Sequence, residues 1–251
     1  MFARLVPVLE GLHQRITLLE APCKKGETAK STGCTPANGN GGEPAAGDGD
    51  GDEGAAPTSE ELEAGAETLS GQLSAAEKSS VSFYVNEGFT DLNAQMRDCP
   101  ESLDCLSAEN KAHAENLQAT IDKAGDLPAP VEAFRGVSMS EEQLGELENK
   151  VLATVGSGEP ISFNGITSMS LQPDIATDFA VEQQEQGIAG AASVLFRIKA
   201  KSGAYLGDTL GMAGGGEQEL VHGHGQQYRV TGFDSETISG NRVRVISLEQ
   251  L

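Results

Sequence analysis

A run of Gly, Ala, Asp and Pro between residues 35 and 58 most constrains how this chain can fold. Residues 35–75 contain nine acidic side chains and no Lys or Arg. Such a composition cannot bury enough apolar surface to offset the conformational entropy that is lost on ordering. We therefore predict a disordered acidic linker at 35–75, with a separate segment at 1–34. The linker is followed by about 175 residues, which suffice for one well-buried core.

The charge of the chain limits its partners. It has 17 basic and 38 acidic residues, a net charge of −21, and such a surface repels nucleic acid and anionic membranes. No apolar run reaches the length of a transmembrane helix. Apolar residues within 1–20 recur at steps of three and four, and polar residues interrupt them. We expect an amphipathic docking helix there rather than a secretory signal, and neither a nucleic acid nor a membrane as partner.

The cysteines leave the redox state of the chain open. Cys23, Cys34, Cys99 and Cys105 contain no CxxC spacing, so a zinc site has little support. Their even number permits two disulfides, but free thiols are also possible.

The order of the expected elements indicates the fold class. A capping signal at Thr58-Ser59 predicts a helix toward Glu77, and further helices are expected at 82–97, 102–124, 140–155 and 174–185. Strands are expected at 131–137, 161–163, 166–170, 192–200, 217–221, 226–234 and 242–248. Helices come first and strands dominate the end, which favours an α+β fold over a βαβ sheet.

Three short motifs carry candidate chemistry. Arg135, followed by Gly136 on an expected strand, can present its planar guanidinium to phosphates, although a surface ion pair is the commoner role of such a residue. Ser168 and Ser170 alternate on a strand, so both hydroxyls point to one face.

The third motif is a pair of glutamates. Glu217 and Glu219 would share one face of an extended chain and repel each other unless a cation lies between them. A cationic ligand or transition state would fit there; a solvated edge strand is the plainer alternative.

Together with their flanks, these motifs resemble the ADP-ribosyltransferase family in its arginine–serine–glutamate branch, which includes binary-toxin enzymes and phage and bacterial exoenzymes. The flanking sequences are YVNEGFTDLNAQMR at 84–97, PVEAFRGV at 130–137 and GEPISFNGITSMSLQP at 158–173. The resemblance covers residues 76–251. It implies the ADP-ribosyltransferase fold, with two packed, mainly antiparallel sheets and N-terminal helices.

The resemblance also implies roles for the motif residues. These enzymes use NAD+ as a substrate and pass ADP-ribose to an acceptor, without a metal. Glu219 would hold the ribose 2′-hydroxyl and stabilise the oxocarbenium-like transition state, and Ser168 would orient Glu219. Arg135 would clamp the pyrophosphate, and Ser170 would support the strand. A Glu at position 217 implies an arginine acceptor, here an exposed arginine of a protein.

Further contacts with NAD+ follow from the same resemblance. Asn93 and Gly136 would contact the cofactor. Phe179 either lies against nicotinamide or packs with Ile175 in the core. Tyr84 and Phe89 are similarly divided between the adenine side and packing.

The chain departs from the family pattern in three places. Met169 replaces a threonine between the two serines, and its side chain should face away from the site. The loop at 211–216 lacks the aromatic residue that contacts a protein acceptor in many members. Some members have a second phosphate-binding arginine shortly after the serine motif. This chain has none there, since no Arg occurs between Pro173 and Arg197.

These departures keep three functions open. The first is transfer of ADP-ribose to protein arginine, by an enzyme carried on a larger protein or on a phage particle. The second is NAD+ hydrolysis or transfer to a small guanidine. The third is a catalytically silent domain with a structural role.

Overall fold

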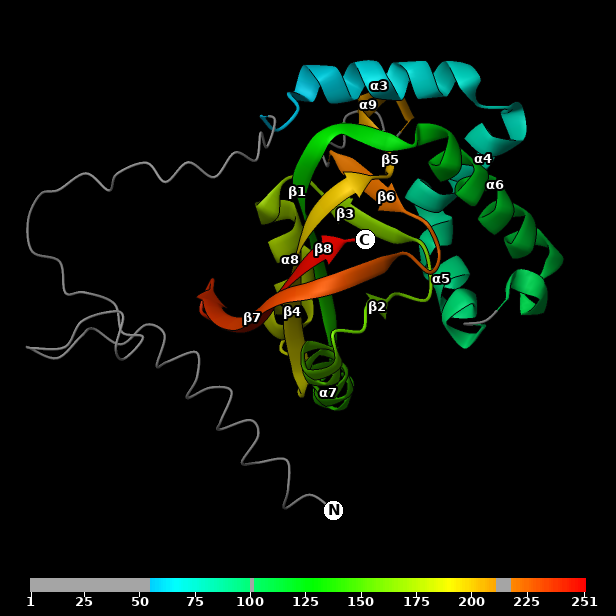
Figure 1. Cartoon of the computed structure of the whole chain (residues 1–251). Coiled ribbons are helices and arrows are strands. Elements are labelled where there is room, and N and C mark those ends of the chain that lie inside the picture. The colour runs from blue at the N-terminus through cyan, green and yellow to red at the C-terminus, as the bar shows by residue number, and fades with distance from the viewer. Residues whose placement is uncertain (1–54, 100–101, 211–217) are drawn as a thin grey trace, which may run out of the picture. The chain divides into compact units, whose positions relative to one another are not determined.

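The computed structural model describes residues 55–99, 102–210 and 218–251 (Figure 1). The expected docking helix at 1–20 and residues 35–54 of the expected linker lie outside the described residues, as do Cys23 and Cys34.

Helices make up most of the first half of the described chain. They are α3 (Ser59–Gln72), α4 (Ala75–Phe83), a π-helical turn η2 (Tyr84–Gly88), α5 (Phe89–Asp98), a 3-10 turn η3 (Leu103–Cys105) and α6 (Ala108–Ala124). Three more follow among the strands: α7 (Glu141–Ser157), α8 (Pro173–Glu185) and α9 (Gly207–Leu210).

Seven of the eight described strands lie where the sequence pattern predicted a strand, and the two-residue β5 was not expected. They are β1 (Asp126–Ser140), β2 (Ile161–Ser162), β3 (Thr167–Ser170), β4 (Ala191–Ser202), β5 (Ala204–Tyr205), β6 (Glu219–His222), β7 (Gln227–Ile238) and β8 (Asn241–Gln250). Their hydrogen bonds join them in the order β2-β7-β8-β4-β1-β3-β6-β5. The expected α+β class is confirmed, with a parallel β4–β8 pair among antiparallel neighbours.

Hydrogen bonding makes one continuous sheet of the described strands, where we expected two packed sheets. The sheet folds back on itself, so its two halves face each other. His222 on β6 and Tyr228 on β7 lie far apart in the strand order, yet the imidazole Nδ1 and the phenol oxygen are 2.7 Å apart. Both side chains are almost fully buried, and burial lowers the pKa of His222 to about 4. The main core cluster lies between the two halves and includes Met169, Phe196 and Tyr228.

Helix α3 lies within the stretch that composition predicted as linker. Thr58 caps it through a reciprocal box with Glu61, as the capping signal indicated. The helix packs on the sheet because Leu62 and Ala66 are buried in the main core cluster. It ends at Gln72 rather than continuing toward Glu77, since Ser74 caps the following helix through a second box with Glu77.

Helices α4 to α6 form a second packed layer, shown at the right of Figure 1. Their buried side chains include Val81, Leu92 and Leu117, which belong to one core cluster. The sulfurs of Cys99 and Cys105 are bonded as a disulfide, which joins the end of α5 to η3. The sequence left disulfides and free thiols open as alternatives, and Cys99 and Cys105 form the disulfide.

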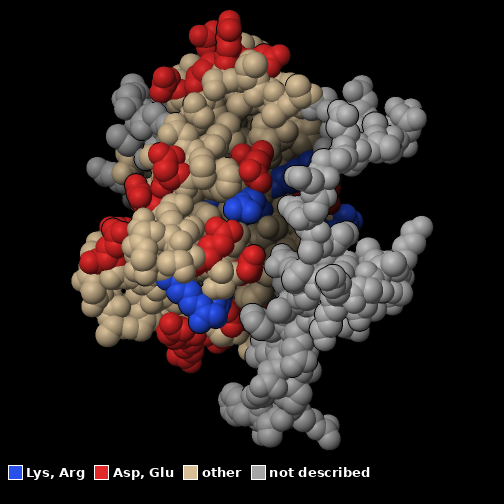
Figure 2. All heavy atoms as spheres, turned by 90° about the vertical axis from the view of Figure 1, so that its left-hand side faces the viewer, with Lys and Arg blue, Asp and Glu red and all other residues tan. Residues whose placement is uncertain are grey.

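Acidic side chains are spread over the face shown in Figure 2, and basic side chains lie next to them. Among the described residues, ion pairs form between Arg244 and Glu148 at 2.6 Å and between Lys201 and Glu249 at 2.9 Å. Within the described part of the chain, no helix is long and apolar enough to cross a membrane.

Candidate active site

One cleft gathers most of the residues that the sequence singled out. It has a volume of about 260 Å³ and lies where η2 and α5 meet β1, β3, α8 and the start of β6. Its walls include all the predicted site residues that the structure describes: Tyr84, Phe89, Asn93, Arg135, Gly136, Ser168, Phe179 and Glu219, and also Ser170. These positions span more than 130 residues of sequence, so only the tertiary fold brings them together.

Ser168 and Glu219 meet across a pair of antiparallel strands. The register of β3 and β6 places Ser170 opposite Glu219 and Ser168 opposite Val221. The Ser168 hydroxyl donates a hydrogen bond to the Glu219 carboxylate, which is the contact predicted for this pair. A carboxylate held by a donor on a neighbouring strand loses rotational freedom, so Glu219 is pre-oriented toward the cleft.

Arg135 lies on the central strand β1 and is tied to the same segment. Its Nη1 donates to the main-chain oxygen of Ser168 at 2.7 Å. Burial lowers the pKa of Arg135, while the nearby Tyr84, Tyr228 and Glu219 favour its charged form. An arginine remains protonated in a protein, so the cleft contains a fixed positive charge close to Glu219.

Arg97 is a further cation, which is exposed and does not line the cleft, and the sequence motifs did not single it out as a site residue. It lies on α5 one turn after Asn93, and its like charge lowers the pKa of Arg135. Two guanidinium groups that repel each other are stabilised by an anion placed between them. The sequence signal that could have pointed to Arg97 is its position four residues after Asn93, because residues four apart lie on the same face of a helix.

Tyr84 and Asn93 hold the wall of the cleft rather than offering free polar groups. The Asn93 side-chain oxygen accepts from the main-chain N–H of Ile166 at 2.9 Å, and its amide donates to the Tyr84 hydroxyl at 3.4 Å. The Tyr84 hydroxyl donates to the Ile166 oxygen at 3.3 Å. Burial raises the pKa of Tyr84 to about 12, so it stays protonated. Of the two alternatives for Tyr84, this arrangement favours packing.

Phe89 and Phe179 have the opposite character. Phe89 is 49% exposed and Phe179 is 53% exposed, although both line the cleft. Pockets for small molecules usually measure about 300–1,000 Å³, so this one would enclose only part of a dinucleotide. The remainder would lie at the mouth, where exposed aromatic rings can stack on it. The exposure of Phe179 argues against the alternative that it packs in the core.

Gly136 lines the cleft, but the structure gives a different reason for its lack of a side chain. A Cβ at this position would lie 1.7 Å from the Ala176 oxygen and 2.6 Å from the Ala180 nitrogen. Helix α8 therefore packs directly on the backbone of β1. The sequence interpretation, in which Gly136 contacts NAD+, did not include this packing contact with α8.

Two remaining expectations have different outcomes. The Met169 side chain is buried in the main core cluster, although Met169 also contributes to the wall of the cleft. Glu217 lies outside the described residues, so its predicted role stays a prediction. No group of three His, Cys, Asp or Glu side chains that could hold a metal occurs among the residues with described positions.

The comparison that decides the family is a match over most of the chain. The model of the ADP-ribosyltransferase exoenzyme family matches residues 63–251. The chain belongs to this family. Its members are NAD-dependent transferases and include the mono-ADP-ribosyltransferase toxins, so the chain is an ADP-ribosyltransferase. No curated protein sequence matches it significantly.

Solved structures agree with the family in fold. The chain is similar to an ADP-ribosyltransferase from Clostridium botulinum at 16% identity and a TM-score of 0.54, covering 77% of this chain and 96% of that one. It is also similar to exoenzyme S from Pseudomonas aeruginosa, solved with human 14-3-3 protein beta and carba-NAD, at 22% identity and a TM-score of 0.52, covering 73% and 81%. A third match is the Vis toxin of Vibrio splendidus, solved with agmatine, at 19% identity and a TM-score of 0.52, covering 78% and 87%.

Proposed function

We propose that the chain transfers ADP-ribose from NAD+ to an exposed arginine of a protein acceptor. The observation that carries this proposal is the hydrogen bond from Ser168 to Glu219, next to the guanidinium of Arg135 in one cleft. An anchored carboxylate beside a fixed cation suits a substrate that joins an anionic pyrophosphate to a ribose with developing positive charge.

The first step breaks the bond between the ribose C1′ and the nicotinamide nitrogen. The electron pair of that bond leaves with nicotinamide, which departs as a neutral molecule and needs no general acid. The positive charge that remains on the ribose is spread over C1′ and the ring oxygen. Glu219 stabilises this charge and accepts a hydrogen bond from the 2′-hydroxyl, a type of contact that strengthens in oxocarbenium-like transition states.

NAD+ is positioned by Arg135 and the aromatic residues of the cleft, together with the exposed Arg97 on α5. Arg135 holds the pyrophosphate, and Arg97 supplies a second positive charge in place of the arginine that is missing after the serine motif. A bidentate arginine is well suited to phosphate oxygens. Phe179 and Phe89 flank the aromatic rings of the dinucleotide at the exposed mouth.

The second step requires a group that accepts a proton from the arginine acceptor. A guanidinium is a poor nucleophile until it loses a proton. Glu217, two residues before Glu219, would hold the guanidinium and take its proton as the nitrogen bonds to C1′. The binding of agmatine, a small guanidine, by the similar Vis toxin supports an acceptor of this class.

A second candidate is transfer to a small guanidine or to water. It is favoured by the composition of the loop at 211–216, which contains no aromatic side chain to contact a protein surface. The same cleft and the same first step serve both candidates, so only the acceptor separates them.

The decisive experiment incubates the purified chain with labelled NAD+ and three acceptors in parallel: a cell lysate, agmatine and buffer alone. Released nicotinamide and label on each acceptor are measured, with Glu219→Ala as control. Protein label that resists mercury and yields to hydroxylamine is expected for arginine. Release of nicotinamide with label on agmatine only, or with no label, would replace the proposal by the second candidate. No turnover in any reaction would favour a catalytically silent domain.

A further inference from the structure

A chain of buried polar side chains lies behind the two strands that carry Ser168 and Glu219. Thr167 on β3 and His222 on β6 are cross-strand partners, and both are almost fully buried. Because successive side chains of a strand point to opposite faces, Thr167 points to the core while Ser168 points to the cleft. The same alternation separates His222 from Glu219, three residues earlier. The polar chain therefore contacts, from the core side, the same strand pair that forms the cleft.

Tyr228 on β7 connects Thr167 and His222. Its hydroxyl and the imidazole Nδ1 of His222 are 2.7 Å apart, and Thr167 forms a hydrogen bond with the same hydroxyl. Burial raises the pKa of Tyr228, so the phenol keeps its proton, whereas the bond with Thr167 acts in the opposite direction. A bond that lowers the pKa of a phenol donates to its oxygen, because it favours the phenolate. Thr167 is therefore the donor to Tyr228.

His222 is the acceptor for the proton of Tyr228. Burial lowers the pKa of His222 to about 4, so the ring is neutral at pH 7 and one of its nitrogens can accept a hydrogen bond. A Cβ at residue 203 would lie 2.7 Å from the ring carbon Cδ2 of His222, so the imidazole packs closely against the chain at Gly203. The hydrogen bonds thus run from Thr167 through Tyr228 to a ring that packing holds in place.

The polar chain joins the two halves of the folded sheet. β7 pairs with β2 and β8, whereas β3 and β6 lie near the other end of the strand order. β3 and β6 have only four residues each, while β7 has 12. A short strand has few main-chain hydrogen bonds to hold it, so a side-chain contact with a long strand contributes a larger share of its restraint. Tyr228 provides this contact.

We propose that Tyr228 is a positioning residue for the cleavage of NAD+, because it holds β3 and β6 in the arrangement that turns Ser168 toward Glu219. The inference rests on the proposed role of Glu219 in the first step of the reaction. Loss of the contact would lower the fraction of molecules in which the carboxylate is oriented for the transition state. Binding of NAD+ would change little, since Arg135 lies on β1, which pairs with β4 along residues 131–140.

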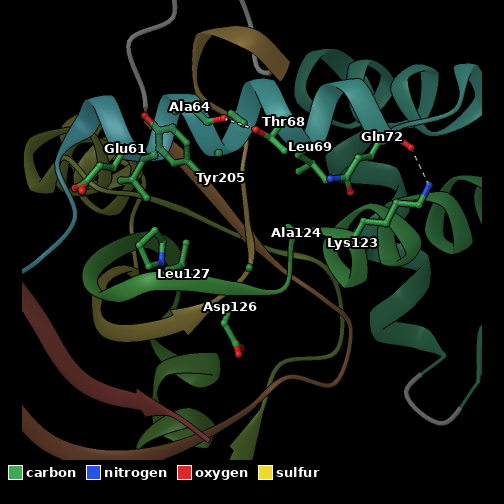
Figure 3. Close-up of a pocket in the computed structure, with 15 residues that line it drawn as sticks. Glu61, Ala64, Thr68, Leu69, Gln72, Lys123, Ala124, Asp126, Leu127 and Tyr205 are labelled. Atoms are coloured by element: carbon green, nitrogen blue, oxygen red, sulfur yellow. Dashed lines mark hydrogen bonds between the residues drawn. The ribbon is translucent and has the colours of Figure 1, made fainter. Parts of the chain in front are cut away.

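The first test compares Tyr228→Phe with the matched control Tyr205→Phe. Both substitutions remove the hydroxyl of a buried tyrosine, and the hydroxyl of Tyr205 donates to Glu63 at 3.0 Å. Figure 3 shows Tyr205 beside α3, at a cavity of about 380 Å³ that shares no lining residue with the cleft. In Tyr228→Phe we expect kcat for nicotinamide release to fall about tenfold, with KM for NAD+ within about twofold of the wild type. Tyr205→Phe should keep the wild-type kcat even if its Tm falls by as much.

A crossed pair of variants at His222 separates hydrogen bonding from packing. In His222→Asn the amide oxygen can replace Nδ1 as the acceptor for Tyr228, although the smaller side chain leaves a gap. In His222→Leu the side chain fills the volume but offers no acceptor. We expect His222→Asn to retain most of kcat and His222→Leu to reproduce the loss seen in Tyr228→Phe. A role in packing alone would give the reverse order.

Amide hydrogen exchange reports on the strands independently of catalysis. Exchange in residues 167–170 should be faster in Tyr228→Phe and His222→Leu and unchanged in Tyr205→Phe. Unchanged kcat in Tyr228→Phe, an equal loss in Tyr205→Phe, or a higher kcat in His222→Leu than in His222→Asn would overturn the proposal. If Tyr228→Phe does not fold, the order of the two His222 variants decides. If the wild type releases no nicotinamide, the proposed function fails, and the exchange rates decide whether Tyr228 holds these strands.

Discussion

Substitution of Gly136 by alanine tests whether close packing of α8 on β1 explains this glycine. The added Cβ would lie 1.7 Å from the Ala176 oxygen and 2.6 Å from the Ala180 nitrogen. Both are main-chain atoms of one helix, so no side chain can rotate away, and the whole of α8 has to move. Insertion of a methyl group into a packed site typically costs about 1–3 kcal/mol, and contact with rigid backbone places this case at the upper end.

The expected change in thermal stability follows from the size of the domain. A loss of about 3 kcal/mol lowers Tm by roughly 6–12 °C in a domain of this size. Thermal unfolding followed by circular dichroism measures this directly. Because α8 carries Ile175 and Phe179 into the cleft, a displaced helix should also raise the KM for NAD+.

Gly145→Ala is the matched control. Gly145 lies in the interior of α7, and a Cβ there would meet no atom within 4 Å. Alanine in a helix is favoured over glycine by about 0.5–1 kcal/mol, so this variant should be slightly more stable than the wild type. The same substitution of glycine by alanine is therefore expected to lower Tm at position 136 and to raise it slightly at position 145. A Gly136→Ala protein with unchanged Tm and unchanged KM would refute the packing argument.

Three further predictions concern the site and its surroundings. Ser168→Ala should lower kcat for nicotinamide release about 10- to 100-fold with little change in KM for NAD+, because a hydrogen bond to a charged group is lost; a normal kcat would exclude the orienting role. Glu217→Gln should retain slow NAD+ hydrolysis but lose arginine transfer by at least about 10²-fold, as measured by label on agmatine, and retained transfer would contradict that assignment. Hydrogen bonding to Lys123 lowers the pKa of Glu77 to about 2 from its usual 4.5, so this pair should stabilise the fold fully above pH 4.5 and lose its contribution as the pH falls toward 2. The Tm difference between wild type and Glu77→Gln should therefore be constant from pH 7 to 5 and shrink below 4.5, and a difference that grows in acid would refute the assignment.

Local sequence patterns determined most of the elements of this chain. The capping residue Thr58 marked the start of α3, and Pro173 marked that of α8, because both satisfy the special geometry of a first helical turn. Alternation on β3 placed Ser168 and Ser170 on one face, since the period of a strand is two. The ordered motifs around Arg135 and Glu219 were sufficient for the family, which the match over 63–251 confirms.

Composition alone misjudged the helix α3. Acidic and small residues dominate this segment, which is typical of a linker, yet Leu62, Ala66 and Leu69 fall on one face and are buried. A few apolar residues at helical spacing suffice when a sheet is available to cover them. The sequence of this segment alone does not indicate that a sheet will be present to cover these residues.

The tertiary structure decided the contacts that join distant parts of the chain. Asn93 was expected to contact NAD+, yet its side-chain oxygen accepts a hydrogen bond from the main-chain N–H of Ile166. Glu63 accepts a hydrogen bond from the hydroxyl of Tyr205, which is 142 residues later in the sequence. Gly136 proved to be a packing glycine, because the position of α8 cannot be read from β1. The residue types determine which chemistry is possible, and the spacing of apolar residues determines whether a helix or a strand forms. The partner of each side chain depends on how the sheet folds back on itself, and this emerges only when all strands are paired.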